Sequence, residues 1–335
     1  MIRLAIRVFV IAIAVALLAI LAIALALRAP YKGFENEVFL RVERGSTTQA
    51  IGRQLADSGV VRYAWQFYLE RAFNRAAKLQ AGEYRFSDAA TPARVFDRMA
   101  RGDVYYFDFT VKEGSNIFDI ATSLDQANIM KAADFLNAAE NPALIRDLAP
   151  SAPSLEGFLF PSTYRLTHFT TAADLCRQMT DQFRKAWKKL SAGPDAGAQS
   201  TVTLASMVEK ETGVAEERTL VAGVFANRLA KGMKLDCDPT VIYAALLDNR
   251  YRNAIHKSDL ASQNSYNTYQ HAGLPPGPIA NPGAAAIAAA LAPAKTDYLY
   301  FVAKPEGGGH QFSATIAEHT RAAQAYRKRR KHAAQ

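Results

Sequence analysis

The sequence predicts an α+β protein with one N-terminal membrane-spanning helix, a small β-α-α-β module, and a larger mixed domain with a helical core and short β-hairpins. The prediction rests on an apolar run at residues 8–27, on a pattern at 39–60 that recurs at 108–129, and on helical periodicity in the second half. The expected segments are a cytoplasmic N-terminus at 1–7, a membrane anchor at 8–27, a linker at 28–38, the β-α-α-β module at 39–106 and the larger domain at 107–335, which divides into 107–164 and 165–335.

Composition excludes several classes of protein. The chain has 335 residues with 21% charged and 10% aromatic residues, which is typical of about two packed domains and not of a disordered, collagen-like or disulfide-stapled chain. The net charge of +9 comes from 40 basic and 31 acidic residues, but 1–32 and 321–335 together hold ten bases and no acid. The remaining 30 bases against 31 acids give the folded middle a charge of −1. A nucleic-acid partner is therefore not expected, because nucleic-acid binding needs a basic folded surface.

The apolar run at 8–27 is the first element. It contains 20 residues without a charge, glycine or proline, enough to cross a hydrocarbon core of roughly 30 Å as a helix. Ala24-Leu25-Ala26 offers a signal-peptide cleavage pattern, but the run exceeds the usual apolar region of about 7–15 residues, so we expect a retained anchor. Arg3 and Arg7 favour an N-inside orientation, although Arg28 on the other flank weakens that argument. The rest of the chain is expected outside the cytoplasm.

The repeat defines the next elements. Val42, Gly45, Ser46, Ile51 and Leu55 match Val111, Gly114, Ser115, Ile120 and Leu124, and Gly59-Val60 matches Asn128-Ile129. Each copy predicts a strand, a helix with Ser46 or Ser115 as N-cap, and a left-handed C-cap at Gly59 or Asn128.

Both copies are expected to close with a strand. The first continues through a helix at about 63–77 to a strand at 81–86, and this order resembles a LysM module, whose relatives bind glycans that contain N-acetylglucosamine. The second continues through a helical stretch around 131–148 to a hydrophobic strand at 155–161, which begins with a carboxylate.

The remaining elements are mainly helical. In chain order we expect a helix at 171–190, a Gly/Pro/Ser linker at 191–200, helices at 202–212 and 216–231, a helix at 238–247 with Asp238 as N-cap and Pro239 at the first position, a loop at 262–283, a hairpin from 298–303 and 311–312, and a last helix with a Thr315/Glu318 capping box. Loops as long as 262–283 are usually functional.

Several kinds of chemistry lack their markers. The six histidines do not have the spacing of a zinc site, and there is no Gly-x-Ser-x-Gly, Ser-x-x-Lys or phosphate-binding loop. No metal or cofactor is expected. Cys176 and Cys237 either pair in an oxidising compartment or lie separately buried, and the sequence leaves both alternatives open.

Glu156 is the most interesting carboxylate. Leu155, Phe158 and Phe160 would surround it with apolar groups, which disfavour its ionised form, as a general acid requires. An exposed carboxylate at a strand end is the alternative. Glu209 and Glu211 lie two apart on a helix and cannot both face one site, so at least one is expected to be solvated or to place charge at a neighbouring helix N-terminus.

Several motifs in order carry a family resemblance. They are Glu156–Tyr164, Ala205–Thr212, Val224–Leu229, Asp238–Tyr243, Ser265–Tyr269, Gly273–Ile279 and Tyr298–Val302. Across roughly 40–330 the chain resembles the YceG-like endolytic murein transglycosylases. The family's catalytic acid opens a Glu-Gly-x-x-x-Pro segment, and Glu156 is the matching residue; Ser162 stands where members often have Asp.

The resemblance implies cleavage of the β-1,4 bond between N-acetylmuramic acid and N-acetylglucosamine inside nascent glycan strands, with 1,6-anhydro ends that terminate elongation. Glu211, Asn267 and Tyr269 are candidates for binding the substrate, with ordinary local structure as the alternative. The expected partners are peptidoglycan strands, inner-membrane lipid and peptidoglycan synthases, at a single-pass inner-membrane location with the catalytic part outside. A muramidase and an anchored, noncatalytic glycan-binding protein are the competing functions.

Overall fold

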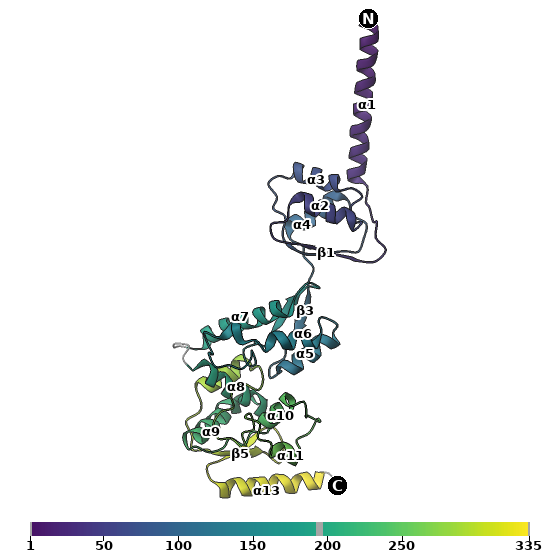
Figure 1. Cartoon of the computed structure of the whole chain (residues 1–335). Coiled ribbons are helices and arrows are strands. Elements are labelled where there is room, and N and C mark those ends of the chain that lie inside the picture. Colours follow the sequence, from purple (N-terminus) through teal and green to yellow (C-terminus); the bar gives the residue numbers. More distant parts are fainter. Residues whose placement is uncertain (1, 192–196, 334–335) are drawn as a thin grey trace. The chain divides into compact units, whose positions relative to one another are not determined.

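The computed structural model describes residues 2–191 and 197–333 (Figure 1). The chain divides into two compact units: unit 1 comprises 1–107 with 165–169, and unit 2 comprises 108–164 with 170–335. The middle of the expected linker at 191–200, residues 192–196, lies outside the described residues.

Helix α1 (Ile2–Arg28) contains the predicted apolar run. Its segment Arg3–Arg28 has a mean hydropathy of 3.3, and none of its most apolar stretch is buried. Among the described residues it is the one helix long and apolar enough to cross a bilayer, so it fits a single-pass membrane anchor.

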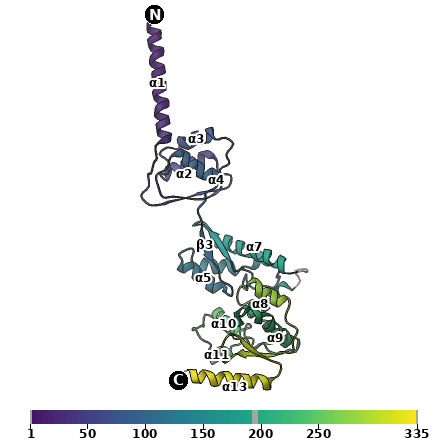
Figure 2. The same ribbon diagram turned by 180° about the vertical axis from the view of Figure 1, so that it is seen from behind.

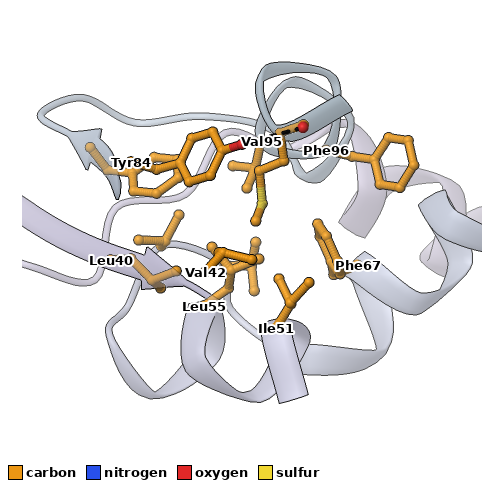
Figure 3. Close-up of a cluster of buried hydrophobic side chains, with 12 residues drawn as sticks. Leu40, Val42, Ile51, Leu55, Phe67, Tyr84, Val95 and Phe96 are labelled. Atoms are coloured by element: carbon orange, nitrogen blue, oxygen red, sulfur yellow. Dashed lines mark hydrogen bonds between the residues drawn. The ribbon is translucent and has the colours of Figure 1, made fainter. Parts of the chain in front are cut away.

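Unit 1 contains the first copy of the repeat, in the expected β-α-α-β order. Its elements after α1 are β1 (Val38–Val42), α2 (Thr48–Asp57), α3 (Ala64–Phe73), β2 (Gly82–Phe86) and α4 (Pro92–Arg101). The two strands are antiparallel, with Val38 opposite Phe86. Figure 3 shows strand and helix side chains, among them Leu40, Leu55 and Phe67, pointing into one buried interior. Burial of these apolar groups is the main stabilisation of so small a unit.

The second copy has the same element order. Its elements are β3 (Phe107–Thr110), α5 (Ile117–Gln126), α6 (Ala132–Ala139), the 3₁₀ helix η1 (Pro142–Ile145) and β4 (Thr163–Leu166), which pairs with β3. Both predicted C-caps are confirmed, because Gly59 and Asn128 have φ of +71° and +54°.

The N-caps lie one residue later than predicted. Thr47 and Asn116 are the caps, and each side chain accepts a bond from the backbone N–H three residues on, at 3.1 and 2.9 Å. The N–H groups of Ser46 and Ser115 instead bond to carbonyls three residues earlier, both at 3.2 Å. The serines are therefore the last residues of the turn that precedes each helix, and the cap falls on their successors.

The strand predicted at 155–161 is wrong. This segment forms a turn in which the Phe158 N–H donates to the Leu155 carbonyl at 2.9 Å, and Gly157 has φ +86°. A residue with such a left-handed backbone reverses the chain and cannot continue a strand. The strand begins only at Thr163, so Glu156 lies on a buried turn.

The rest of unit 2 is mainly helical. Its helices are α7 (Ala172–Leu190), α8 (Ala198–Glu211), the 3₁₀ helix η2 (Ala215–Glu217), α9 (Arg218–Ala230), α10 (Asp238–Leu247), α11 (Lys257–Leu260) and α12 (Ala284–Leu291), with the predicted loop 262–283 before α12. Helices α8, α9 and α12 pack against one another (Figure 2). Two boundaries differ from the prediction. Helix α8 starts at Ala198 after a left-handed Gly197, and Cys237, whose backbone is extended, is the N-cap of α10 in place of Asp238.

The C-terminal hairpin and capping box are confirmed. Strands β5 (Tyr300–Ala303) and β6 (His310–Ser313) are antiparallel around the glycines at 307–309, and α13 (Ile316–Ala333) follows and packs on them. The Thr315 N–H donates to the Glu318 carboxylate at 3.1 Å, and the Glu318 N–H donates to the Thr315 hydroxyl at 3.3 Å.

Candidate active site

The turn that carries Glu156 is built closely against the 262–283 loop. A Cβ added at Gly157 would lie 2.4 Å from the Pro278 side chain and 2.9 Å from that of Val202. Any side chain larger than hydrogen at 157 would displace the loop or α8. The glycine thus permits both the left-handed backbone and the close approach that bury Glu156.

Glu156 is 1% exposed, and its carboxylate accepts hydrogen bonds from four neutral groups. The Ile117 N–H, in the first turn of α5, donates to Oε2 at 2.9 Å, and Nδ2 of Asn281 donates to Oε1 at 2.8 Å. The Tyr243 hydroxyl, from α10, and the backbone N–H of Gly157 are the other two donors. A buried carboxyl group is therefore held in one orientation without a cationic partner among these contacts.

This environment favours the protonated acid. Burial raises the pKa of Glu156 to about 8, and the nearby Asp119 carboxylate acts in the same direction. The hydrogen bonds from Ile117 and Tyr243 lower the pKa of Glu156, but by less than burial raises it. The expected apolar setting of Glu156 is thus present, and the group carries its proton at neutral pH.

Asn281 and Tyr243 are side-chain partners of Glu156 that sequence reasoning missed as site residues, and Asn281 has the larger set of contacts. It is fully buried, and besides bonding to Glu156 its Nδ2 donates to the Ser115 carbonyl at 2.9 Å while its Oδ1 accepts from the Leu159 N–H at 2.9 Å. The backbone N–H of Asn281 also donates to the Ser115 carbonyl at 2.9 Å. One side chain therefore joins the entry to α5, the Glu156 turn and the long loop. Its only signal in the sequence is its place in that loop, in the run Ile-Ala-Asn-Pro-Gly.

Aromatic rings pack around the tyrosine that contacts Glu156. The Tyr243 ring lies with its centroid 5.1 Å from that of Tyr266 and 6.1 Å from that of Phe118. Tyr243 and Tyr266 are 2% and 7% exposed. These rings contribute to the low-polarity environment that raises the Glu156 pKa.

Two of the other predicted site residues share a cavity. Glu211 and Tyr269 line a space of about 380 Å³ together with Asp236, Asp238, Arg228 and the aromatic rings of Phe225, Tyr300 and Phe301. The Cys237 thiol donates to Glu211 Oε1 at 3.0 Å, and the Tyr269 hydroxyl donates to Asp238 at 2.7 Å. Burial raises the pKa of Glu211 as well. Cys237 and the buried Cys176 are both free thiols.

One helix links this cavity to Glu156. Asp238 and Tyr243 lie five residues apart on α10, which is about 7.5 Å along the helix axis. Asp238 lines the cavity and Tyr243 contacts Glu156. The acid and the polar cavity are thus held by neighbouring turns of the same helix.

Asn267 and Glu209 occupy structural positions. Asn267 is fully buried; its Nδ2 donates to backbone carbonyls, including that of Ser262 at 2.7 Å, and its Oδ1 accepts from the Tyr269 N–H at 3.0 Å. Glu209 Oε2 accepts from the Gly283 N–H at 2.9 Å, at the N-terminus of α12. Glu209 Oε1 forms an ion pair with the Arg218 guanidinium at 3.6 Å. The prediction that one of the two α8 glutamates supplies charge to a neighbouring helix is confirmed for Glu209.

Residues 40–325 match the model of the YceG-like family. The endolytic murein transglycosylase of Bacillus subtilis (strain 168) is 31% identical over 316 residues, which cover 88% of this chain and 86% of that protein. The endolytic murein transglycosylase of Streptococcus pneumoniae serotype 2 is 26% identical over 317 residues, which cover 85% of this chain but 57% of the longer relative. A crystal structure of a yceG-like protein from Listeria monocytogenes has a TM-score of 0.54 and 30% identity, covering 86% of this chain and 99% of its own.

Proposed function

Because this chain belongs to the YceG-like family, we propose that it is an endolytic murein transglycosylase whose general acid is Glu156. The substrate is the glycan strand of peptidoglycan, and the bond cleaved joins N-acetylmuramic acid to N-acetylglucosamine. The observation that carries the proposal is a buried carboxyl group that keeps its proton at neutral pH and has a fixed orientation.

A single carboxyl group is enough for this reaction. Glu156 donates its proton to the glycosidic oxygen as the bond to C1 breaks, and the 6-hydroxyl of the same muramic acid then attacks C1. The Glu156 carboxylate accepts the proton that this hydroxyl loses, so the acid is regenerated and no water is consumed. Because nucleophile and electrophile belong to one sugar, correct placement of the ring supplies much of the acceleration.

We propose the cavity beside α10 as part of the glycan-binding surface. Glu211 and Tyr269 offer a carboxyl group and a hydroxyl for sugar hydroxyl and acetamido groups, and the neighbouring aromatic rings offer faces on which sugars pack. The contacts of Asn267 support an indirect role, in which it holds the loop that carries Tyr269.

The module at 39–106 is proposed to be LysM-like and to bind the same glycan strand that the catalytic domain at 107–335 cleaves. Support for this comes from the β-α-α-β order and the antiparallel pairing of β1 with β2. A second binding site for the polymer on the same chain raises the effective concentration of the strand at the catalytic domain and favours cuts inside strands.

We further propose a single-pass inner-membrane location, with the span at 8–27, residues 1–7 inside and the catalytic part outside. The length and hydropathy of α1 support the span, and Arg3 and Arg7 support the orientation. Membrane lipid is then a partner by position, and peptidoglycan synthases are proposed partners because they make the strands that would be cut.

The products of the full-length, detergent-solubilised protein test this function. Purified glycan strands should give 1,6-anhydromuramic ends by mass spectrometry, in fragments of several disaccharides, with no ¹⁸O incorporated from labelled water. Reducing ends that carry ¹⁸O would identify a muramidase, and release of anhydro-disaccharides alone would identify an exolytic enzyme. Binding without cleavage would identify a noncatalytic protein.

A further inference from the structure

The four partners of Glu156 differ in what they can do when the acid is protonated. A protonated carboxyl group has one O–H, which needs an acceptor if it is buried. The backbone N–H groups of Ile117 and Gly157 can only donate. The amide of Asn281 is fixed with its NH₂ group toward Glu156, because its oxygen already accepts from the Leu159 N–H at 2.9 Å. None of these three groups can receive the proton of Glu156.

Tyr243 is different because a phenol hydroxyl can donate or accept by rotating about its C–O bond. Its ring is held by Phe118 and Tyr266 and is 2% exposed, so the hydroxyl hydrogen is the part that moves. The other titratable neighbours do not bond to Glu156. Asp119 and Tyr266 act on it only through space, and burial raises the pKa of Tyr266, so that this phenol stays neutral.

We propose that Tyr243 is the positioning residue that holds the proton of Glu156, by a hydrogen bond that reverses direction with the state of the acid. In the resting enzyme Glu156 donates to the Tyr243 oxygen. When the proton passes to the glycosidic oxygen and the C1–O bond breaks, the Tyr243 O–H rotates and donates to the new carboxylate. When the sugar 6-hydroxyl returns a proton to Glu156, the hydroxyl rotates back, so Tyr243 stays neutral throughout.

This inference rests on the proposed role of Glu156, and its first test is the pH dependence of catalysis. In Tyr243→Phe we expect kcat to fall about 10- to 100-fold, because the acid loses its fixed direction, with KM little changed. The alkaline limb of the kcat profile should also move to higher pH. The bond that Tyr243 donates to the Glu156 carboxylate is charge-assisted and stronger than the bond that it accepts from the acid, so losing both raises the pKa of Glu156. Tyr164→Phe is the matched control: it removes another buried hydroxyl, bonded to the Phe160 carbonyl, and should leave the limb in place.

Two further measurements distinguish a failure of this inference from loss of folding and from a wrong assignment of Glu156 as the general acid. Replacing Tyr243 with 3-fluorotyrosine keeps the hydroxyl but makes it a stronger donor, so the alkaline limb should move to lower pH, opposite to the effect of Phe. The ¹³C chemical shift of the Glu156 carboxyl carbon, assigned by its loss in Glu156→Gln, reports the titration without any need for activity. If this titration is the same in wild type, Tyr243→Phe and the fluorotyrosine protein, the proposal is overturned even where Glu156 proves to be the acid.

Discussion

The chain buries one glutamate near the end of each β-α-α-β copy, Glu83 on the closing strand and Glu156 on the turn before it, and their partners differ. Glu83, on β2 in unit 1, is 2% exposed and is bound by the backbone N–H of His168 at 2.9 Å and by its Nδ1 at 2.7 Å. Glu156, in unit 2, is 1% exposed and is bound by neutral donors. Neutral donors only partly offset the desolvation of a buried carboxylate, and at Glu156 burial raises the pKa to about 8. The two glutamates therefore share their burial and differ in their hydrogen-bond partners, and only the neutral set of partners matches the general acid proposed at Glu156.

The largest effect expected from this difference is on turnover. Glu156→Gln keeps the size of the side chain but has no acidic proton, so activity should fall by a factor of about 10² to 10⁴. Glu83→Gln is the matched control, because it alters an equally buried glutamate and should keep most of the activity. Release of anhydro-ended fragments measures both. Near-normal turnover in Glu156→Gln would show that Glu156 is not the general acid and would make Glu211 the next candidate.

The next effect concerns the turn that buries Glu156. Gly157→Ala should destabilise unit 2 by about 2–5 kcal/mol, because the left-handed backbone is unfavourable for alanine and the added methyl meets Pro278. Gly45→Ala, in the first copy, has the same backbone strain at φ +84° but open space around the new methyl, and should cost about 1–2 kcal/mol. Thermal unfolding of both variants measures the contrast, and equal losses would contradict it.

The pH dependence of activity should also distinguish the two glutamates. Because Glu156 must be protonated in the free enzyme and its pKa is raised to about 8, kcat/KM should fall about tenfold per pH unit above that value. Glu83→Gln should leave this alkaline limb where it is. A limb that begins near the ordinary pKa of a glutamate would contradict the proposed state of the acid.

The smallest effect, counted per pH unit, is on stability. Between the ordinary glutamate pKa of 4.5 and about 8, the folded protein binds a proton at Glu156 that the unfolded chain has released. The contribution of Glu156 to stability is therefore complete at low pH and decreases as pH rises through this window, by at most about 1.4 kcal/mol per pH unit. Glu156→Gln lacks this slope. Thermal unfolding of both proteins from about pH 5 to 8 should show the wild type losing stability relative to the variant, and parallel curves would contradict the prediction.

Local patterns predicted most of the elements. The positions of Gly59 and Asn128 predicted left-handed C-caps, and Thr315 with Glu318 predicted a capping box, because each depends on a few neighbouring residues. The failures were local too: Ser46 and Ser115 are turn residues beside the true caps, and the run 155–161 has a strand composition but contains a glycine whose φ is +86°.

The apolar N-terminal helix, the repeat, the helix limits to within a few residues and the choice of Glu156 as candidate acid could all be predicted from local sequence patterns. The surroundings of that acid depend on tertiary packing. Tyr243 and Asn281 are 87 and 125 positions further along the chain, on a helix and in a loop. No local sequence pattern in either segment predicts a contact with residue 156. The pKa of a carboxyl group depends on burial and on the atoms within a few ångströms of it, and those atoms come together only when the helices pack.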